Sequence, residues 1–258
     1  MKAIVTGAAA LALFSFPALA DGIDGTWKAD LGSTKLPKKP DVYVVGGGNF
    51  SCKTCTPAFN IKADGKDQAV KGSPYFDSAA VTLGDHKVTE VDKKGGKTVT
   101  TTETVIAADG KSATQSFTDT SASTTPVTGK VMLTRAAPGA KGSHPMSGSW
   151  HVASYSGISD NGLTITYKSG GGMLSMSTPA GQSYSAKLDG TPAPYKGDPG
   201  TDMVSVKMAG KSVVETDMRG GKPIAVYTTT PSADGKSLSI KSENKLKGTS
   251  MIFTAKKM

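Results

Sequence analysis

The chain has 258 residues, of which 37% are hydrophobic and only 6% aromatic, so a core must be built mainly from aliphatic side chains. Lys and Arg exceed Asp and Glu by nine, a balance that would steer anionic partners toward the protein. The lysines are scattered among turns and do not alternate with aromatic residues, unlike the stacking surfaces that bind nucleic acid. We therefore expect no nucleic-acid partner.

Residues 1–20 have the pattern of a secretory signal peptide. A positively charged start is followed by an apolar run, and the small residues of Ala18-Leu19-Ala20 suit signal peptidase. A membrane anchor is the alternative, but the run is shorter than about 18 residues and Asp21 follows it. We expect cleavage after Ala20, a periplasmic or secreted protein, and no transmembrane segment in the cleaved chain.

Two copies of one module make up the rest of the chain. Short motifs recur in the same order at a nearly constant spacing of 125 residues, which indicates an internal duplication. Segment 136–145 is small, polar and proline-bearing, and is typical of a linker. We therefore predict β module one at 21–135 and β module two at 146–258. The matching motifs include Asp64-Gly65 with Asp189-Gly190, Lys71-Gly72 with Lys196-Gly197, and Ala108-Asp109-Gly110 with Ala233-Asp234-Gly235.

Alternating apolar and polar residues predict half-buried strands in both copies. The alternation is clear in segments 59–63, 163–167, 184–188 and 204–208. The Asp-Gly and Gly-Gly pairs that separate such runs tolerate the positive φ angles of tight hairpins. The fold class is therefore all-β, with each copy an antiparallel meander of about eight strands that a small barrel would close.

A Gly-x-Trp motif opens each copy, ending at Trp27 and at Trp150. It resembles the first strand of lipocalins, in which the Trp lies across the barrel floor beneath a basic residue that follows the last strand. The resemblance implies a floor made by Trp27 with Arg135 in module one and by Trp150 with Lys256 in module two. A β-sandwich in which each Trp only packs in the core is the alternative.

The chain as a whole resembles a group of secreted bacterial proteins with tandem lipocalin-like repeats. The resemblance rests on Gly25-Thr26-Trp27-Lys28, on the Lys-Gly-Gly-Lys hairpin at 94–97 and on the Ala-Asp-Gly-Lys-Ser hairpins at 108–112 and 233–237. It covers nearly all of the chain after the signal peptide. The group implies a lipocalin-like fold and carries no activity over to this sequence.

Cys52 and Cys55 form the one local motif with redox potential. A thioredoxin-type Cys-x-x-Cys needs a helix after it, whereas Pro57 and a predicted strand follow here. Zinc would need two further ligands, and the chain has no second cysteine pair. We expect a structural disulfide, with a thiol–disulfide activity as the alternative.

No other pattern predicts a catalytic residue, a cofactor or a metal site, and no pair of carboxylates stands out for acid–base work. The sequence therefore favours an exported, non-catalytic protein that binds a small apolar or amphipathic ligand in its barrels. The alternative is an envelope interaction module with filled barrels, which presents its basic surface to an anionic partner. Since Cys52, Cys55 and Arg135 have no counterparts in copy two, a special activity would be sought in copy one first.

Overall fold

The computed structural model describes residues 22–258, so the predicted signal peptide at 1–20 lies outside the described residues. The described chain is all-β and forms two ten-stranded antiparallel sheets, each rolled into a barrel, as predicted. Ten strands replace the expected eight or so partly because β5 and β15 are separate strands of two residues each. Within residues 22–258, no helix is long and apolar enough to cross a membrane.

Barrel one is built from ten consecutive strands in the spatial order β4-β3-β2-β11-β10-β9-β8-β7-β6-β5. Every neighbouring pair is antiparallel, and hairpins with glycine turns connect most of them. The strands are β2 (Asp41–Gly46), β3 (Asn49–Cys52), β4 (Phe59–Lys62), β5 (Gln68–Ala69), β6 (Ser78–Gly84), β7 (Lys87–Lys94), β8 (Lys97–Ile106), β9 (Ser112–Asp119), β10 (Val127–Pro138) and β11 (Gly148–Ser156).

Barrel two has the equivalent order, β14-β13-β12-β1-β20-β19-β18-β17-β16-β15. A two-way backbone bridge between Ser183 and Lys196, at 3.0 and 2.9 Å, closes it, whereas barrel one is nearly closed. The strands are β1 (Gly25–Lys35), β12 (Thr164–Gly170), β13 (Met173–Ser177), β14 (Ser183–Lys187), β15 (Ala193–Pro194), β16 (Met203–Ala209), β17 (Ser212–Arg219), β18 (Lys222–Pro231), β19 (Ser237–Asn244) and β20 (Thr249–Lys257).

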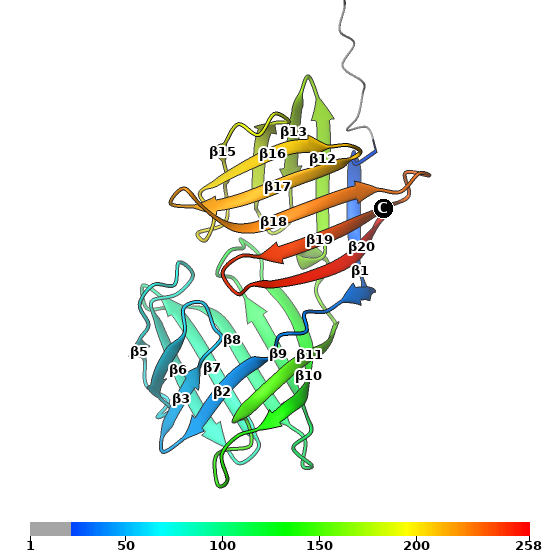
Figure 1. The fold of residues 1–258 in the computed structure, drawn as a ribbon. Helices are drawn as coiled ribbons and strands as arrows, with labels where there is room; N and C mark the ends of the chain where they lie inside the picture. Colours follow the sequence, from blue (N-terminus) through cyan, green and yellow to red (C-terminus); the bar gives the residue numbers. More distant parts are fainter. Residues whose placement is uncertain (1–21) are drawn as a thin grey trace, which may run out of the picture.

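The first strands of the two sequence copies are exchanged between the barrels. β1 opens copy one but lies between β12 and β20 of copy two, and β11 opens copy two but lies between β2 and β10 of copy one. Figure 1 shows the blue β1 beside the red β20, and the green β11 beside β2. The predicted boundaries 21–135 and 146–258 are therefore wrong for the folded units. Barrel one is segment 41–156, and barrel two joins the start of the chain to segment 164–258.

The connection after β1 explains the exchange. The chain between β1 and β2 is Leu36-Pro37-Lys38-Lys39-Pro40, and proline fixes φ and pushes the residue before it into extended backbone. Such a segment runs straight on and disfavours the tight turn that would fold β1 back onto β2. After β11 the chain passes from barrel one back to barrel two, and this connection contains the short 3-10 helix η1 (Asp160–Gly162).

Segment 136–145 is not a linker between barrels, contrary to the prediction. β10 continues to Pro138, and the rest of the segment turns the chain into β11 within the same barrel. His144 fixes this turn to barrel one, because its backbone N–H donates to Val45 O at 3.1 Å and its ring Nε2 lies 2.7 Å from Gly84 O. Composition suggested a linker because small polar residues serve connections of both kinds.

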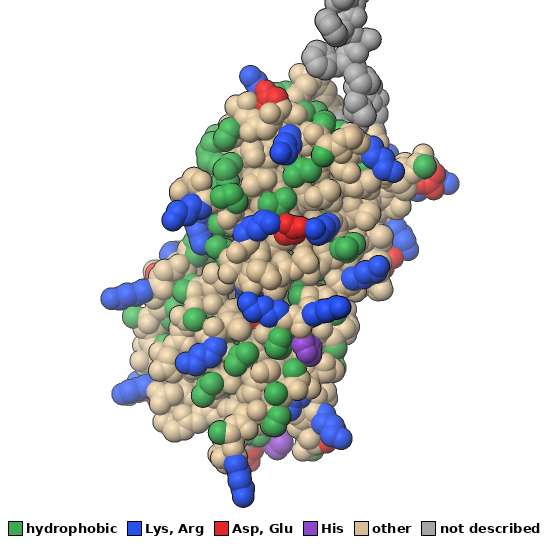
Figure 2. Space-filling model, viewed as in Figure 1, with side chains coloured by type: hydrophobic (Ala, Val, Ile, Leu, Met, Phe, Trp, Pro, Cys, Tyr) green, Lys and Arg blue, Asp and Glu red, His purple; other side chains and the backbone are tan. Residues whose placement is uncertain are grey.

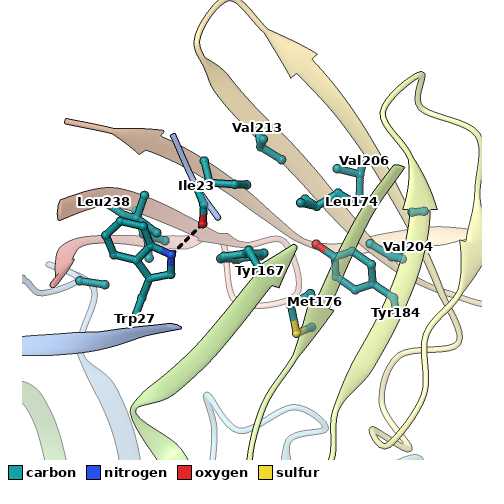
Figure 3. Close-up of a cluster of buried hydrophobic side chains, with 13 residues drawn as sticks. Ile23, Trp27, Tyr167, Leu174, Met176, Tyr184, Val204, Val206, Val213 and Leu238 are labelled. Carbon is teal, nitrogen blue, oxygen red and sulfur yellow. Dashed lines mark hydrogen bonds between the residues drawn. The ribbon is translucent and has the colours of Figure 1, made fainter. Parts of the chain in front are cut away.

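Each barrel encloses its own apolar core, formed by the inward side of the alternating strands. In barrel two the inward residues of β16 are Val204 and Val206, which are fully buried, while Lys207 beside them is exposed. Figure 3 shows Trp27 and Tyr184 on opposite sides of this core, with Tyr167 between them in the view. Trp27 belongs to β1, so the exchanged strand supplies a central part of the core of barrel two.

Candidate functional site

The floor of barrel one is made by Arg135 and Trp150, not by Arg135 and Trp27 as predicted. The Arg135 guanidinium lies 4.0 Å above the Trp150 ring, at a distance that suits a cation–π contact. It also donates from Nη1 to Ser147 O at 2.7 Å, and the indole Nε1 of Trp150 donates to Met146 O at 2.9 Å. The predicted partner was wrong because the strand exchange carries Trp27 into the other barrel.

The floor of barrel two pairs Trp27 with Lys257, whose Nζ lies 5.3 Å from the ring. Trp27 Nε1 donates to Ile23 O at 2.7 Å, which repeats the arrangement of barrel one (Figure 3). Lys256, the predicted floor residue, instead forms an ion pair with Asp30 at 3.0 Å. Neighbouring residues of a strand face opposite sides, so only one of the two lysines reaches the indole.

The glycine of each Gly-x-Trp motif is required by the backbone. Gly25 and Gly148 both have φ of +127°, a region that residues with a Cβ avoid. A Cβ on Gly148 would lie 2.3 Å from the carbonyl oxygen of Ala137. The motif therefore combines a bend that needs glycine with the tryptophan that closes the floor.

Cys52 and Cys55 form the predicted disulfide. Cys52 is 1% exposed and belongs to the core of barrel one. The disulfide loop lies between β3 and β4, next to the place where barrel one stays open. The equivalent place in barrel two is closed by the bridge from Ser183. This placement fits a structural clamp on an incomplete part of the wall.

A pair of carboxyl groups lies inside each barrel. Glu90 and Asp92 are on β7, and Glu215 and Asp217 hold the same positions on β17, 125 residues later. Each pair continues the inward series begun by an apolar residue, Val213 in the case of β17. The Oδ1 atoms of Asp92 and Asp217 are buried without a hydrogen-bond partner.

Burial shifts the pKa of all four carboxyl groups upward. It raises the pKa of Glu90 to about 8 and that of Asp92 to about 7, and each also responds to a neighbouring carboxyl group. It raises the pKa of Asp217 to about 8, with the neighbouring Glu215 adding to the rise. The pKa of Glu215 is raised as well, against the lowering effect of hydrogen bonds from Tyr184 and Asp217. Each barrel therefore retains protons at neutral pH that ordinary carboxyl groups have lost.

Tyrosines surround the carboxyl pair of barrel two. Tyr184 Oη donates to Glu215 Oε2 at 2.5 Å, and the rings of Tyr184 and Tyr195 lie 5.9 Å apart. Burial first, and the Glu215 carboxyl next, raise the pKa of Tyr184 and Tyr195 far above the ordinary value. Burial and Asp217 do the same to the pKa of Tyr227. These phenols stay neutral and act as hydrogen-bonding groups or aromatic faces.

Two cavities meet at this group of side chains. A cavity of about 240 Å³ opens in barrel two, and a larger one of about 410 Å³ lies at the junction of the two barrels. Asp217 and Tyr227 line both cavities, and Asp92 lines the junction cavity from the side of barrel one. The lining of the smaller cavity consists of Ala29, Gly162, Leu163, Thr164, Ile165, Tyr167, Met176, Thr178, Tyr195, Glu215, Asp217, Tyr227, Ile240, Phe253 and Ala255.

The sequence contains a signal for the carboxyl pairs that is not a contiguous motif. In β7 the residues Val88, Glu90 and Asp92 occupy alternate positions, so the acids continue the inward face of the strand. The same pattern recurs in β17 at the spacing of the duplication. Acidic residues at inward positions of a strand, present in both copies, were the available clue.

The basic side chains do not gather into one patch on the face seen in Figure 2, where Lys and Arg are spread singly over both barrels. Among residues 22–258, no group of three or more His, Cys, Asp or Glu side chains is placed to hold a metal ion. The ionisable groups that line the two cavities include the carboxyl pairs of both barrels and the tyrosines of barrel two.

Comparison of the chain with protein-family models, with curated proteins and with solved structures gave no match. The resemblance to secreted proteins with tandem lipocalin-like repeats therefore stays a prediction, and the function must be argued from the site.

Proposed function

We propose that this chain is an exported, non-catalytic binding protein and that barrel two holds a small amphipathic ligand. The observation that carries the proposal is the cavity of about 240 Å³ in barrel two, lined mostly by apolar and aromatic side chains together with a few polar groups. Ligand sites in proteins have this composition. The volume lies below the range of about 300–1,000 Å³ typical of drug-sized ligands, so the ligand is small.

The exchanged strand forms part of the cavity wall. Ala29 on β1 pairs with Ala255 on β20, and both line the cavity. Two small side chains facing each other leave space that larger residues would fill. The counterpart of Ala29 in barrel one is Val152 on β11, which packs against the core of that barrel.

The two other candidate functions have less support. An envelope module with filled barrels needs a solid interior and a basic patch, whereas the cavity and the scattered lysines favour ligand binding. A thioredoxin-type activity needs a helix after the pair to activate its thiol, whereas strand β4 follows here and Cys52 is buried in the core.

The proposal is tested with a neutral apolar fluorescent probe, N-phenyl-1-naphthylamine, and with native mass spectrometry of the protein released from its own cell envelope. We expect saturable probe binding and a co-purifying small molecule. Ala29→Phe fills the cavity and is expected to weaken probe binding about tenfold or more, since it removes the space the probe occupies. Val152→Phe, the matched change in barrel one, is expected to leave probe binding within about twofold.

Hydrogen exchange of both variants shows whether each barrel is still folded. The absence of both a co-purifying molecule and saturable probe binding would overturn the proposal. So would probe binding by folded Ala29→Phe that is as tight as in the unaltered protein.

A further inference from the structure

The carboxyl pair that lines the cavity indicates which chemical class of ligand barrel two takes. We infer that Glu215 and Asp217 bind the ammonium group of a small organic amine, whose apolar part occupies the rest of the cavity. This inference rests on the proposed function and adds the identity of the ligand's head group. It assigns a role to a carboxyl pair that the fold itself does not need for closure or for its floor.

The two carboxyl groups differ in how well their oxygens are satisfied. Glu215 accepts the hydrogen bond from Tyr184 at 2.5 Å. Asp217 is only 7% exposed, and its Oδ1 has no hydrogen-bond donor. Buried polar atoms in folded proteins nearly always have a partner, and one that lacks it needs an explanation. A ligand that brings N–H donors into the cavity would supply the missing partner.

The pair also lacks a counter-charge from the protein. In the described part of the chain, neither Glu215 nor Asp217 takes part in an ion pair. This is so although the chain carries nine more basic than acidic residues. Arg219 follows on the same strand and lines the junction cavity, but it makes no ion pair with Asp217. Buried charges without a partner are costly, so a cationic ligand would be bound in preference to a neutral one.

The aromatic lining suits a cation. Tyr167, Tyr195 and Tyr227 line the cavity beside the carboxyl pair. Aromatic faces attract ammonium groups, and combinations of aromatic rings with acids form the cages that bind them. An organic ammonium fits better than a metal ion, because the pair offers two carboxyl groups and no third acidic, His or Cys ligand lies with them in the described residues.

Barrel one provides the contrast that places the site in barrel two. At the positions of Tyr184, Tyr195 and Tyr227 it has a phenylalanine, a valine and a threonine. Asp92 Oδ1 also lacks a partner, and aromatic rings line the junction cavity beside Glu90 and Asp92, but barrel one has no phenol at the position from which Tyr184 donates to Glu215. The residues of barrel one at these three tyrosine positions are Phe59, Val70 and Thr102.

The inference predicts a definite pH dependence. Burial raises the pKa of Asp217 to about 8, so the pair holds an extra proton at neutral pH and must release it to bind an ammonium. Affinity for an amine should rise as the pH increases toward 8, while an alkylammonium stays protonated throughout this range. Several charged and titratable groups face Asp217 or share its cavities. They are Glu215, Asp198, Arg219, Lys247, Glu90, Asp92, Tyr75, Tyr167, Tyr184, Tyr195 and Tyr227.

The experiment compares octylamine with 1-octanol as competitors of N-phenyl-1-naphthylamine, since the two differ only in the head group. We expect octylamine to bind about tenfold or more tightly at pH 8, because its charged hydrogen bonds to the pair are absent in the alcohol. Asp217→Asn should bring the affinities for octylamine and 1-octanol within about threefold of each other. Asp92→Asn, the matched change in barrel one, should leave the preference intact.

Each result separates the inference from the function on which it rests. If neither compound competes, the proposed function itself fails. If 1-octanol competes as well as octylamine, or if the preference survives in Asp217→Asn, barrel two binds ligands but the ammonium site is wrong. A preference for octylamine that does not change between pH 6 and pH 8 would also contradict the role of the carboxyl pair. The pair must release its proton when the ammonium binds, so the affinity has to depend on pH.

Discussion

Barrel one and barrel two share a tryptophan floor and a buried Glu-x-Asp pair, but they differ in what surrounds that pair. In barrel two Tyr184 donates to Glu215, and further tyrosines line a cavity next to Asp217. In barrel one the positions of Tyr184, Tyr195 and Tyr227 hold Phe59, Val70 and Thr102, and the disulfide of Cys52 and Cys55 clamps the wall. The shared features build the barrel, so the residues that differ indicate where a ligand is selected.

The difference also corrects where activity should be sought. Cys52, Cys55 and Arg135 are the conspicuous residues of copy one in the sequence, but in the structure they serve the wall and the floor of barrel one. The tyrosines of copy two are inconspicuous in sequence because tyrosine is common in strands. Their meaning depends on the buried carboxyl groups beside them.

The largest expected effect tests which barrel each tryptophan belongs to. Trp27→Ala removes a fully buried indole and should destabilise barrel two by about 3–5 kcal/mol. Because β1 lies in barrel two, hydrogen exchange should rise in segment 164–258 and stay unchanged in segment 41–147. Trp150→Ala should give the reverse pattern. If hydrogen exchange rose in segment 41–135 after Trp27→Ala, β1 would belong to barrel one and the first strands would not be swapped between the barrels.

Much of this fold was predictable because its signals are local. Alternation, Asp-Gly and Gly-Gly turns and the Gly-x-Trp motifs act within a few residues, and they predicted strands, hairpins and a buried Trp in each copy. They cannot identify the partner of the first strand, because a duplicated chain offers it two equivalent places. The partner depends on the connection 36–40, where Pro37 and Pro40 keep the backbone extended.

The candidate site was predictable only in part for a related reason. Glu215 and Asp217 precede an Arg-Gly-Gly turn, and in sequence they look like the polar end of a hairpin. Their inward orientation follows from counting the alternation from Val213, a step that the turn residues obscure. The cavity depends on how Ala29 of β1 faces β20, which only the exchanged topology reveals.

A second prediction compares the carboxyl pairs through pH. The folded-state pKa is raised to about 7 for Asp92 and about 8 for Asp217, whereas both groups in the unfolded chain titrate near the ordinary aspartate value of about 3.9. The folded chain therefore holds protons at these two groups that the unfolded chain has lost, so their contribution to the free energy of unfolding is largest below about pH 4 and falls as the pH rises through the folded-state pKa values.

Replacing either aspartate by asparagine removes the charge that is costly to bury. At pH 9 Asp217→Asn should raise the free energy of unfolding by about 1–3 kcal/mol, and Asp92→Asn should raise it by roughly 1 kcal/mol less, because the pKa of Asp92 is raised less. Both effects should vanish at pH 4. Urea unfolding of the two variants at pH 4 and pH 9 measures this. Equal stability of variant and unaltered protein at both pH values would contradict the buried, proton-retaining carboxyl groups.

The smallest expected effect concerns the disulfide, which only barrel one contains. Reduction opens a ring of four residues, so it should lower the stability of barrel one by about 2 kcal/mol or less and leave barrel two unchanged. Because Cys52 is buried, reduction should be slow until barrel one opens locally, and hydrogen exchange in segment 49–62 should rise together with thiol release. Rapid reduction of the folded protein without increased exchange would instead favour the thiol–disulfide activity, since a sulfur that reacts in the native state acts as more than a clamp on the wall.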